Sequence, residues 1–176
     1  HPNTYLPYGC NGKYAEAGKK SGVKFPVTAD GGINTPEMSE EIHAPGKAAA
    51  VAMRRALIAD PYWPKKVRAG RLNEIHQCLR CTNCLAEMHP TDQFHCDVNP
   101  FSGHEVLFQD RKPKAARAKT VWIAGGGPGG MTAAITAAER GHTVTLFEAG
   151  ERLGGLLNYT DKDQKFKRDL HLFKEK

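Results

Sequence analysis

Four of the five cysteines fall within 19 residues: Cys78, Cys81, Cys84 and Cys96. The first three are separated by two residues each, so they can surround one side of a metal centre while Cys96 closes it. A [4Fe–4S] cluster needs one thiolate per iron, which these four residues supply. Structural zinc is the alternative, although its sites typically use two separate C-x2-C pairs. Three histidines could contribute to a zinc site: His76, His89 and His95. The spacing favours the iron–sulfur cluster.

A second group of residues able to do chemistry is a glycine-rich loop after an apolar segment. Its spacing G-x-G-x-x-G is provided by Gly125, Gly127 and Gly130, and Pro128 opens the following helix. In this pattern the glycines permit a tight turn, a close approach of pyrophosphate to the backbone, and close packing of helix on strand. The helix N-terminus then faces the phosphates. Glu148, after the next strand, would accept hydrogen bonds from ribose hydroxyls.

The residues after Glu148 favour FAD over NAD in this second site. Arg152, Gly154 and Gly155 form an Arg-x-Gly-Gly turn. Such a turn after the second strand resembles flavoproteins of the two-dinucleotide-binding type, in which it lies along the cofactor. A loop that caps a helix is the alternative interpretation of the same residues.

The first 70 residues show two strand-then-helix units. Residues 24–29 form an apolar run that ends at a glycine pair, and Thr35 can cap a helix that ends near residue 45. Residues 48–53 are the second strand candidate, and Asp60 can begin a helix that ends at Gly70. This alternation predicts parallel α/β architecture.

The rest of the chain divides into three parts. Residues 71–101 carry the cysteines with little periodicity, and residues 102–118 are polar and basic like a linker. Residues 119–176 predict a strand at 120–124, a helix at 128–140 and a strand at 143–147. The chain starts without methionine and stops within an expected helix at 174–176. We therefore expect a fragment of a larger protein.

Composition excludes several classes of protein. The 176 residues are 40% hydrophobic and 25% charged, with 18 glycines and 11 prolines, which excludes a disordered or collagen-like chain. The sequence contains no apolar run of the length that a membrane helix needs. The net charge of +6 is scattered without interleaved aromatic residues, so we expect no nucleic-acid partner. Clustered cysteines of this kind favour a reducing, cytoplasmic location.

The motifs described above and several others occur along the chain in a characteristic order. They are Gly31–Glu37, Arg55–Pro61, the four clustered cysteines, Cys96–Pro100, Gly125–Gly130, Gly141–Glu148 and Leu153–Gly155. This order resembles the iron–sulfur flavoenzymes related to old yellow enzyme, which are NADH:flavin oxidoreductases similar to 2,4-dienoyl-CoA reductase and trimethylamine dehydrogenase. The resemblance covers essentially the whole chain.

The resemblance implies that residues 1–70 are the last two β/α units of a TIM barrel that carries FMN. The FMN phosphate would lie beside four residues: Gly31, Gly32, Arg54 and Arg55. This agrees with the usual place of barrel phosphate sites, after strands seven and eight. Arg54 stands where the family usually has glycine, Ala49 where it has an acid, and Asp30 where it has an apolar residue.

The same resemblance implies a relay in which NAD(P)H reduces FAD and the cluster passes electrons to FMN. FMN would then reduce an activated alkene, such as an enoyl thioester or an enone. We assign no catalytic residue in this segment, because the substrate pocket and proton donor would come from earlier strands, and we expect the fragment alone to be inactive. Two alternatives are a non-catalytic electron-transfer module and a zinc-stabilised nucleotide-binding module.

Overall fold

The computed structural model describes residues 5–86, 95–108 and 113–159. The chain divides into two compact units, His1–Glu105 and Val106–Lys176. The expected helix at 174–176 lies outside the described residues. No helix within the described ranges is long and apolar enough to cross a membrane.

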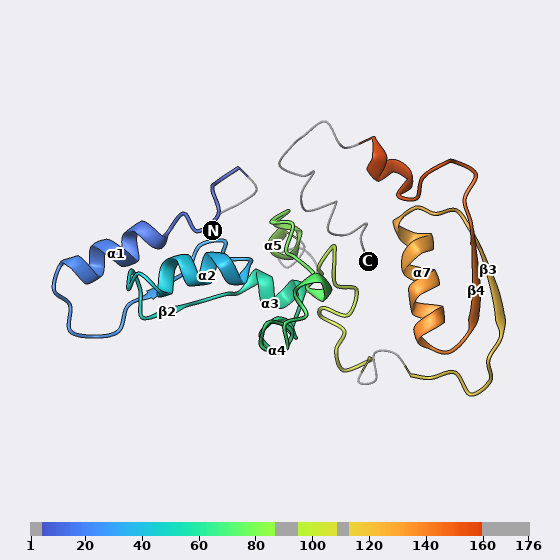
Figure 1. The fold of residues 1–176 in the computed structure, drawn as a ribbon, viewed down its shortest axis with the longest axis horizontal. Coiled ribbons are helices and arrows are strands. Elements are labelled where there is room, and N and C mark those ends of the chain that lie inside the picture. The colour runs from blue at the N-terminus through green and yellow to red at the C-terminus, as the bar shows by residue number, and fades with distance from the viewer. Residues whose placement is uncertain (1–4, 87–94, 109–112, 160–176) are drawn as a thin grey trace. The chain divides into compact units, whose positions relative to one another are not determined.

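The first unit alternates helices with short strands (Figure 1). In chain order its elements are α1 (Gly12–Lys20), β1 (Thr28–Ala29), α2 (Pro36–His43), β2 (Ala50–Val51), α3 (Arg55–Ala59), α4 (Trp63–Arg68), the 3-10 turn η1 (Leu72–Glu74) and α5 (Asn83–Ala86). Strands β1 and β2 pair in parallel, with Thr28 opposite Ala50. The structure thus confirms the parallel β/α order.

Both strands are shorter than the sequence predicts. Hydrogen bonds from Ala49 N to Val27 O and from Ala52 N to Ala29 O extend the pairing by one bond at each end. Pro26 has no N–H to donate, so the ladder stops there. The two strands still place their carboxyl ends side by side, immediately before Asp30 and Ala52.

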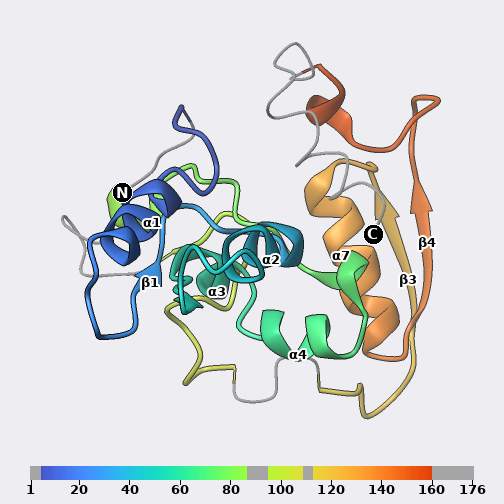
Figure 2. The same ribbon diagram turned by 60° about the vertical axis from the view of Figure 1, so that its left-hand side comes forward.

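The predicted cap of α2 is present. The Thr35 hydroxyl accepts a hydrogen bond from Met38 N at 3.3 Å, and Pro36 occupies the first turn. The preceding helix α1 has no such signal, because the Asn11 side chain donates to Asp30 instead of capping the helix. The two helices meet at the core of the unit, which contains five buried side chains: Ala15, Ala29, Ile33, Ile42 and Ala48. Figure 2 shows α1, β1 and α2 together.

The structure differs from the predictions around residues 54–63. Arg54 and Arg55 were expected in a turn, but Arg55 begins the unpredicted short helix α3. Asp60 was expected to cap the next helix, whereas α4 begins only at Trp63. The Asp60 carboxylate accepts from Tyr62 N at 3.0 Å, which makes a local Asx turn before the helix.

The second unit contains β3 (Thr120–Ala124), α7 (Pro128–Glu139), β4 (Thr143–Phe147) and the 3-10 turn η2 (Gly155–Asn158). The strands pair in parallel over their full length, and α7 lies along one face of the pair (Figures 1 and 2). Both strands have the predicted bounds, and α7 ends one residue before the predicted end. Gly141 follows the helix with a φ of +94°, as a helix-ending glycine does.

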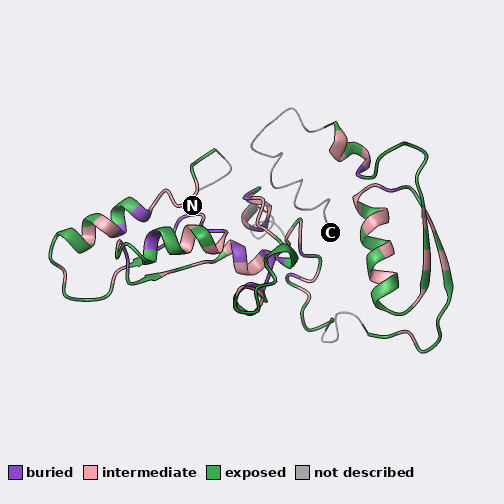
Figure 3. Ribbon diagram, viewed as in Figure 1, coloured by how far each residue is buried: buried purple, intermediate pink, exposed green. Residues whose placement is uncertain are grey.

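Burial differs between the two units (Figure 3). The first unit has a buried core, whereas no residue of β3, α7 or β4 is buried. On the face of the sheet away from α7, Trp122 is 75% exposed and packs edge-on against Phe147, with 6.0 Å between ring centroids. Parallel strands are usually covered on both faces. Apolar packing in the second unit therefore gives its loop little support, and hydrogen bonds must position it.

Candidate cluster and cofactor sites

All four predicted cluster ligands line one cavity of the first unit. They are Cys78, Cys81, Cys84 and Cys96. Cys84 lies on α5 and is buried, and the neighbouring wall is apolar, with Ile58, Leu79 and Val98. All five cysteines of the chain are free thiols. Cys10 does not line this cavity, in agreement with its isolated place in the sequence.

The loop that carries the first three cysteines has an unusual backbone. Arg80 and Thr82, on either side of Cys81, both adopt left-handed conformations, with φ of 56° and 65°. Such conformations are unfavourable for residues other than glycine, so surrounding contacts must hold them. Arg80 supplies contacts of this kind: its guanidinium donates to Leu6 O at 2.7 Å and lies 3.7 Å from the ring centre of Tyr8.

The cavity disfavours thiolates unless a cation accompanies them. Burial raises the pKa of Cys78 and of Cys96, and the charges of neighbouring thiolates raise them further. Burial, together with a hydrogen bond to Asp97, raises the pKa of Cys81 to about 12. A bound metal removes this cost because it holds coordinating thiols in their ionised form. Ionised thiols in this cavity would therefore need a bound metal to accompany them.

The described donors do not form a site for a single metal ion such as zinc. Zinc binds sulfur at about 2.3 Å, so its ligands must converge on one point. Within the described residues, no group of three or more His, Cys, Asp or Glu side chains converges in this way. In a cubane cluster each thiolate binds a different iron, so the sulfurs are farther apart.

The histidines weighed as zinc ligands have other surroundings. His76 Nδ1 lies 3.3 Å from Val98 O, and the ring of His95 lies at a tilt of 53° to that of His104, with 5.7 Å between centroids. His89 lies outside the described residues.

Two buried polar side chains fasten the cysteine segment to the preceding helices. The Asp60 carboxylate accepts from Lys66 Nζ and from His76 N. Asn99 donates from Nδ2 to Ile58 O at 2.7 Å. Burial opposes ionisation of Asp60, but the hydrogen bonds that its carboxylate accepts outweigh this effect and lower its pKa. A third buried side chain, Asn34, holds Cys78 itself.

Sequence reasoning missed these three roles. It interpreted Asp60 only as a helix cap, and Asn34 and Asn99 only as parts of motifs. The available signal was a short polar side chain next to residues expected to be buried, which requires a hydrogen-bond partner.

The predicted FMN phosphate residues also lie together. Gly31, Gly32, Arg54 and Arg55 line a second cavity of about 170 Å³, at the carboxyl ends of β1 and β2. Both glycines have positive φ, +110° and +76°, and a Cβ on Gly31 would come within 3.0 Å of Asn11. Glycine is therefore required at position 31. Two guanidinium groups and a glycine turn suit an anion such as phosphate.

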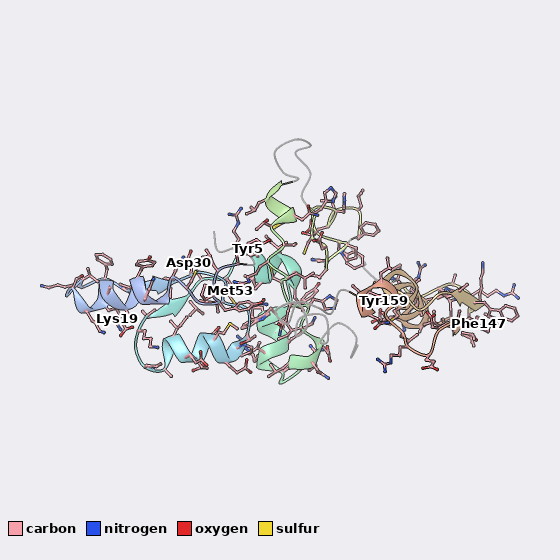
Figure 4. The ribbon with its side chains drawn as sticks, turned by 90° about the horizontal axis from the view of Figure 1, so that it is seen from above. Tyr5, Lys19, Asp30, Met53, Phe147 and Tyr159 are labelled. Carbon is pink, nitrogen blue, oxygen red and sulfur yellow. The ribbon has the colours of Figure 1, made fainter. Side chains whose placement is uncertain are left out.

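The positions that depart from the family pattern are accommodated in this cavity. Arg54 has a φ of −111°, which an ordinary side chain adopts without strain. Asp30 also lines the cavity, and its carboxylate accepts from Asn11 Nδ2 at 2.8 Å. Figure 4 labels Asp30 and Met53, both of which line this cavity. The change at Ala49 has no structural explanation.

The two cavities share part of their walls. Arg55 and Cys78 line both of them. The anion cavity and the four-cysteine cavity are therefore adjacent.

In the second unit, the glycine loop has the geometry that its spacing predicts. Gly125 has a φ of +98°, and Gly127 precedes α7 with open space where a Cβ would project. A Cβ on Gly130 would overlap the carbonyl oxygen of Gly125. Close contact between helix and strand therefore requires Gly130, and the open side of Gly127 leaves room for a ligand.

Glu148 has a second role that the sequence did not indicate. Its carboxylate accepts from Gly150 N at 2.8 Å and from Gly126 N at 2.7 Å. These backbone hydrogen bonds lower the pKa of Glu148. The side chain thus holds the glycine loop in place, and its exposed oxygens retain lone pairs for a ribose hydroxyl.

The Arg-x-Gly-Gly turn folds back onto the same loop. Gly154 N donates to Gly126 O at 2.8 Å, and a Cβ on Gly155 would lie 3.1 Å from Gly127 Cα. Arg152 is exposed beside this turn. The turn and the glycine loop are thus in direct contact.

Comparisons with known proteins identify the family. Residues 11–74 match the NADH:flavin oxidoreductase / NADH oxidase family, and residues 123–176 match an NAD(P)-binding Rossmann-like domain. The chain is 46% identical over 140 residues to an NADH oxidase of Thermoanaerobacter brockii, covering 78% of this chain and 21% of that protein. The chain belongs to the NADH:flavin oxidoreductase family.

Two further relatives support this assignment. A cinnamate reductase of Clostridium sporogenes is 36% identical over 156 residues, which cover 88% of this chain and 23% of that enzyme. The solved structure of a 2-naphthoyl-CoA reductase complex matches 98% of this chain and 26% of its own, at 32% identity and a TM-score of 0.88. The chain thus spans about a quarter or less of these relatives.

These matches confirm the family, the fold and the cofactors predicted from the motifs. The fold combines the end of a TIM barrel, a cysteine loop and part of a Rossmann-like domain. The cofactors of the family are FMN, FAD, a [4Fe–4S] cluster and NAD(P)H. The predicted boundaries at residues 70, 101 and 118 remain predictions, and the division between the two units falls within the predicted linker.

Proposed function

We propose that the intact protein uses NAD(P)H to reduce an activated alkene. We also propose that this chain carries residues that bind its three redox cofactors, FMN, FAD and the cluster. The observation that carries the proposal is the shared wall: Arg55 and Cys78 line both the anion cavity and the four-cysteine cavity. A flavin held by its phosphate in the first cavity would lie beside a cluster in the second. When bound, the flavins exchange electron pairs, and the cluster transfers single electrons.

Each group of residues has its own role in this proposal. The cluster ligands are Cys78, Cys81, Cys84 and Cys96. The FMN phosphate residues are Gly31, Gly32, Arg54 and Arg55, in which the guanidinium groups neutralise the phosphate. The FAD residues are Gly125, Gly127, Pro128, Gly130, Glu148, Arg152, Gly154 and Gly155, with the start of α7 facing the pyrophosphate.

The relatives support a conjugated substrate. Cinnamate and 2-naphthoyl-CoA, named in two of them, both carry a carbon–carbon π-system conjugated to a carboxyl or thioester carbonyl. We therefore propose an enoyl thioester or enone as the substrate class. The five free thiols are consistent with a reducing compartment, and we place the protein in the cytoplasm.

A second candidate function is NADH oxidation with dioxygen as the electron acceptor. It is favoured by the 46% identity to an NADH oxidase. The two functions differ in their acceptor, whereas the cofactor sites of this chain serve both. NADH consumption under argon, with and without an enoyl thioester, distinguishes them. NADH consumption that requires air and is unchanged by the enoyl thioester would establish the oxidase function.

The cofactor assignments are tested on full-length protein purified without oxygen. We expect about four irons, one FMN and one FAD per chain, measured by metal analysis and absorption spectroscopy. Cys81→Ser should remove most of the iron, whereas Cys10→Ser, the matched control outside the cavity, should retain it. One equivalent of zinc without iron in the wild type would show that the cluster assignment is wrong.

FAD binding is tested separately. Gly127→Asp places a carboxylate in the open space before α7, where it would repel the pyrophosphate. We expect loss of FAD with unchanged iron and FMN content. Retention of FAD by this variant would exclude the glycine loop as its site.

A further inference from the structure

Asn34 makes a two-point contact with the first cluster ligand. Its side-chain Nδ2 donates to Cys78 O at 3.2 Å, and its Oδ1 accepts from Cys78 N at 3.3 Å. The two residues are 44 positions apart in the chain. Asn34 is 2% exposed, so water does not compete for these hydrogen bonds. The side-chain amide therefore holds the backbone on both sides of the Cys78 α-carbon.

The backbone of Asn34 is itself held in place. Its carbonyl oxygen accepts from the indole Nε1 of the buried Trp63 at 3.2 Å. In the sequence, Asn34 directly follows the turn Gly31–Gly32 and the buried Ile33. The contact thus links the glycine turn of the anion cavity to the first residue of the cysteine cavity.

Cys78 is the cysteine whose position affects both cavities. It is the one cluster ligand that also lines the anion cavity. Its thiol accepts from Arg80 N at 3.4 Å, which orients the sulfur once the backbone is fixed. Movement of the Cys78 backbone would therefore change cluster binding and the separation of the cluster from a flavin.

We propose that Asn34 is a positioning residue that holds the Cys78 thiolate in place for the cluster. The proposal rests on the cluster assignment made above. Asn suits this position because its short amide presents a donor and an acceptor side by side, as a peptide group does. Leu has a similar size but can make neither hydrogen bond, and a longer Gln amide would not fit the same distance.

The test compares Asn34→Leu with wild-type full-length protein. Loss of a residue that orients a metal ligand typically reduces metal affinity about 10- to 100-fold. We therefore expect about tenfold or greater acceleration of iron loss to a chelator under argon. We also expect a changed electron paramagnetic resonance spectrum of the reduced cluster, because the geometry at one iron has changed. If Leu prevents folding, Asn34→Ala removes the same hydrogen bonds without apolar bulk.

Ile42→Ala serves as the matched control. Ile42 is buried in the core of the same unit, in contact with α1, and it lines neither cavity. Its truncation lowers stability through a cavity. We expect this control to keep the wild-type resonance spectrum and, at equal thermal stability, to lose iron more slowly than the Asn34 variants.

Two results would contradict the inference in distinguishable ways. Equal iron loss and unchanged spectra in the Asn34 variants and Ile42→Ala would show that Asn34 only stabilises the fold, and the cluster assignment would stand. A wild-type protein that binds no iron–sulfur cluster would overturn the cluster assignment and this inference together.

Discussion

In the first unit, side chains from distant segments hold the cysteine cavity. Asn34, Asp60 and Asn99 reach backbone groups that lie 44, 16 and 41 positions away in the chain. In the second unit, the glycine loop is held by backbone contacts, by one nearby side chain, the Glu148 carboxylate, and by positions without side chains, such as Gly126 and Gly130. The comparison indicates that removing a polar atom should damage the first site, whereas adding a carbon should damage the second.

The largest effect is expected for Gly130→Ala. The added Cβ would overlap the Gly125 carbonyl oxygen, so α7 and β3 must move apart, at a cost of about 3 kcal/mol. Hydrogen exchange of the amides in β3 and α7 should become faster, and FAD should be lost. Gly129→Ala is the control, because no atom lies within 4 Å of its added Cβ. If both variants bound FAD equally well, close packing would not be the reason for glycine at 130.

Asp60→Asn should have the next largest effect, in the first unit. The change replaces a buried carboxylate that accepts from Lys66 and from two backbone N–H groups, and should cost about 2 kcal/mol at neutral pH. Faster exchange of the His76 amide, with unchanged exchange in β3, would confirm a local effect. Equal acceleration in both units would show that the effect is not local to the first unit.

The same residue predicts a dependence on pH. Folding lowers the pKa of Asp60. Its contribution to the free energy of unfolding is therefore fully present above its ordinary pKa, 3.8, and is lost as the pH falls through its lower pKa in the folded state. Wild-type stability should therefore fall below about pH 4, and the difference from Asp60→Asn should narrow there. Denaturant unfolding of both proteins across this pH range measures the difference in their free energies of unfolding. A constant difference would show that the carboxylate charge contributes nothing.

Thr35→Ala should have a smaller effect. It removes the hydroxyl that accepts from Met38 N, which typically costs about 1 kcal/mol. Exchange should accelerate in α2, the helix next to the glycine turn. Glu40→Ala, at an exposed position within the same helix, is the control and should change stability by less than about 0.5 kcal/mol. Similar exchange in the two variants would exclude a stabilising cap.

Glu148→Gln should change stability least, because the side chain is exposed. Its single amide oxygen can replace only one of the two carboxylate oxygens that accept from Gly126 N and Gly150 N. We expect weaker FAD binding than in wild type, but stronger than in Gly127→Asp, measured by flavin titration of the apoprotein. FAD affinity equal to wild type would show that the loop does not need Glu148.

Local patterns predicted the second unit well. The bounds of β3 and β4 follow from apolar runs next to a glycine loop. In the first unit, the predicted cap at Thr35 likewise involves a partner only three residues away. Helix α1 was missed because Asn11, which precedes it, bonds to Asp30, 19 residues later. Predictions succeeded where the deciding contact was local and failed where it came from a distant segment.

The sequence by itself determined the family and the order of the motifs, and it predicted the residues of each cofactor site, because spacing and chemistry are properties of short segments. Only the tertiary structure decided that Arg55 and Cys78 border both cavities, and that Asn34 holds Cys78. These contacts join residues far apart in the chain. They depend on how β1, α3 and the cysteine loop pack, and packing involves all these segments at once.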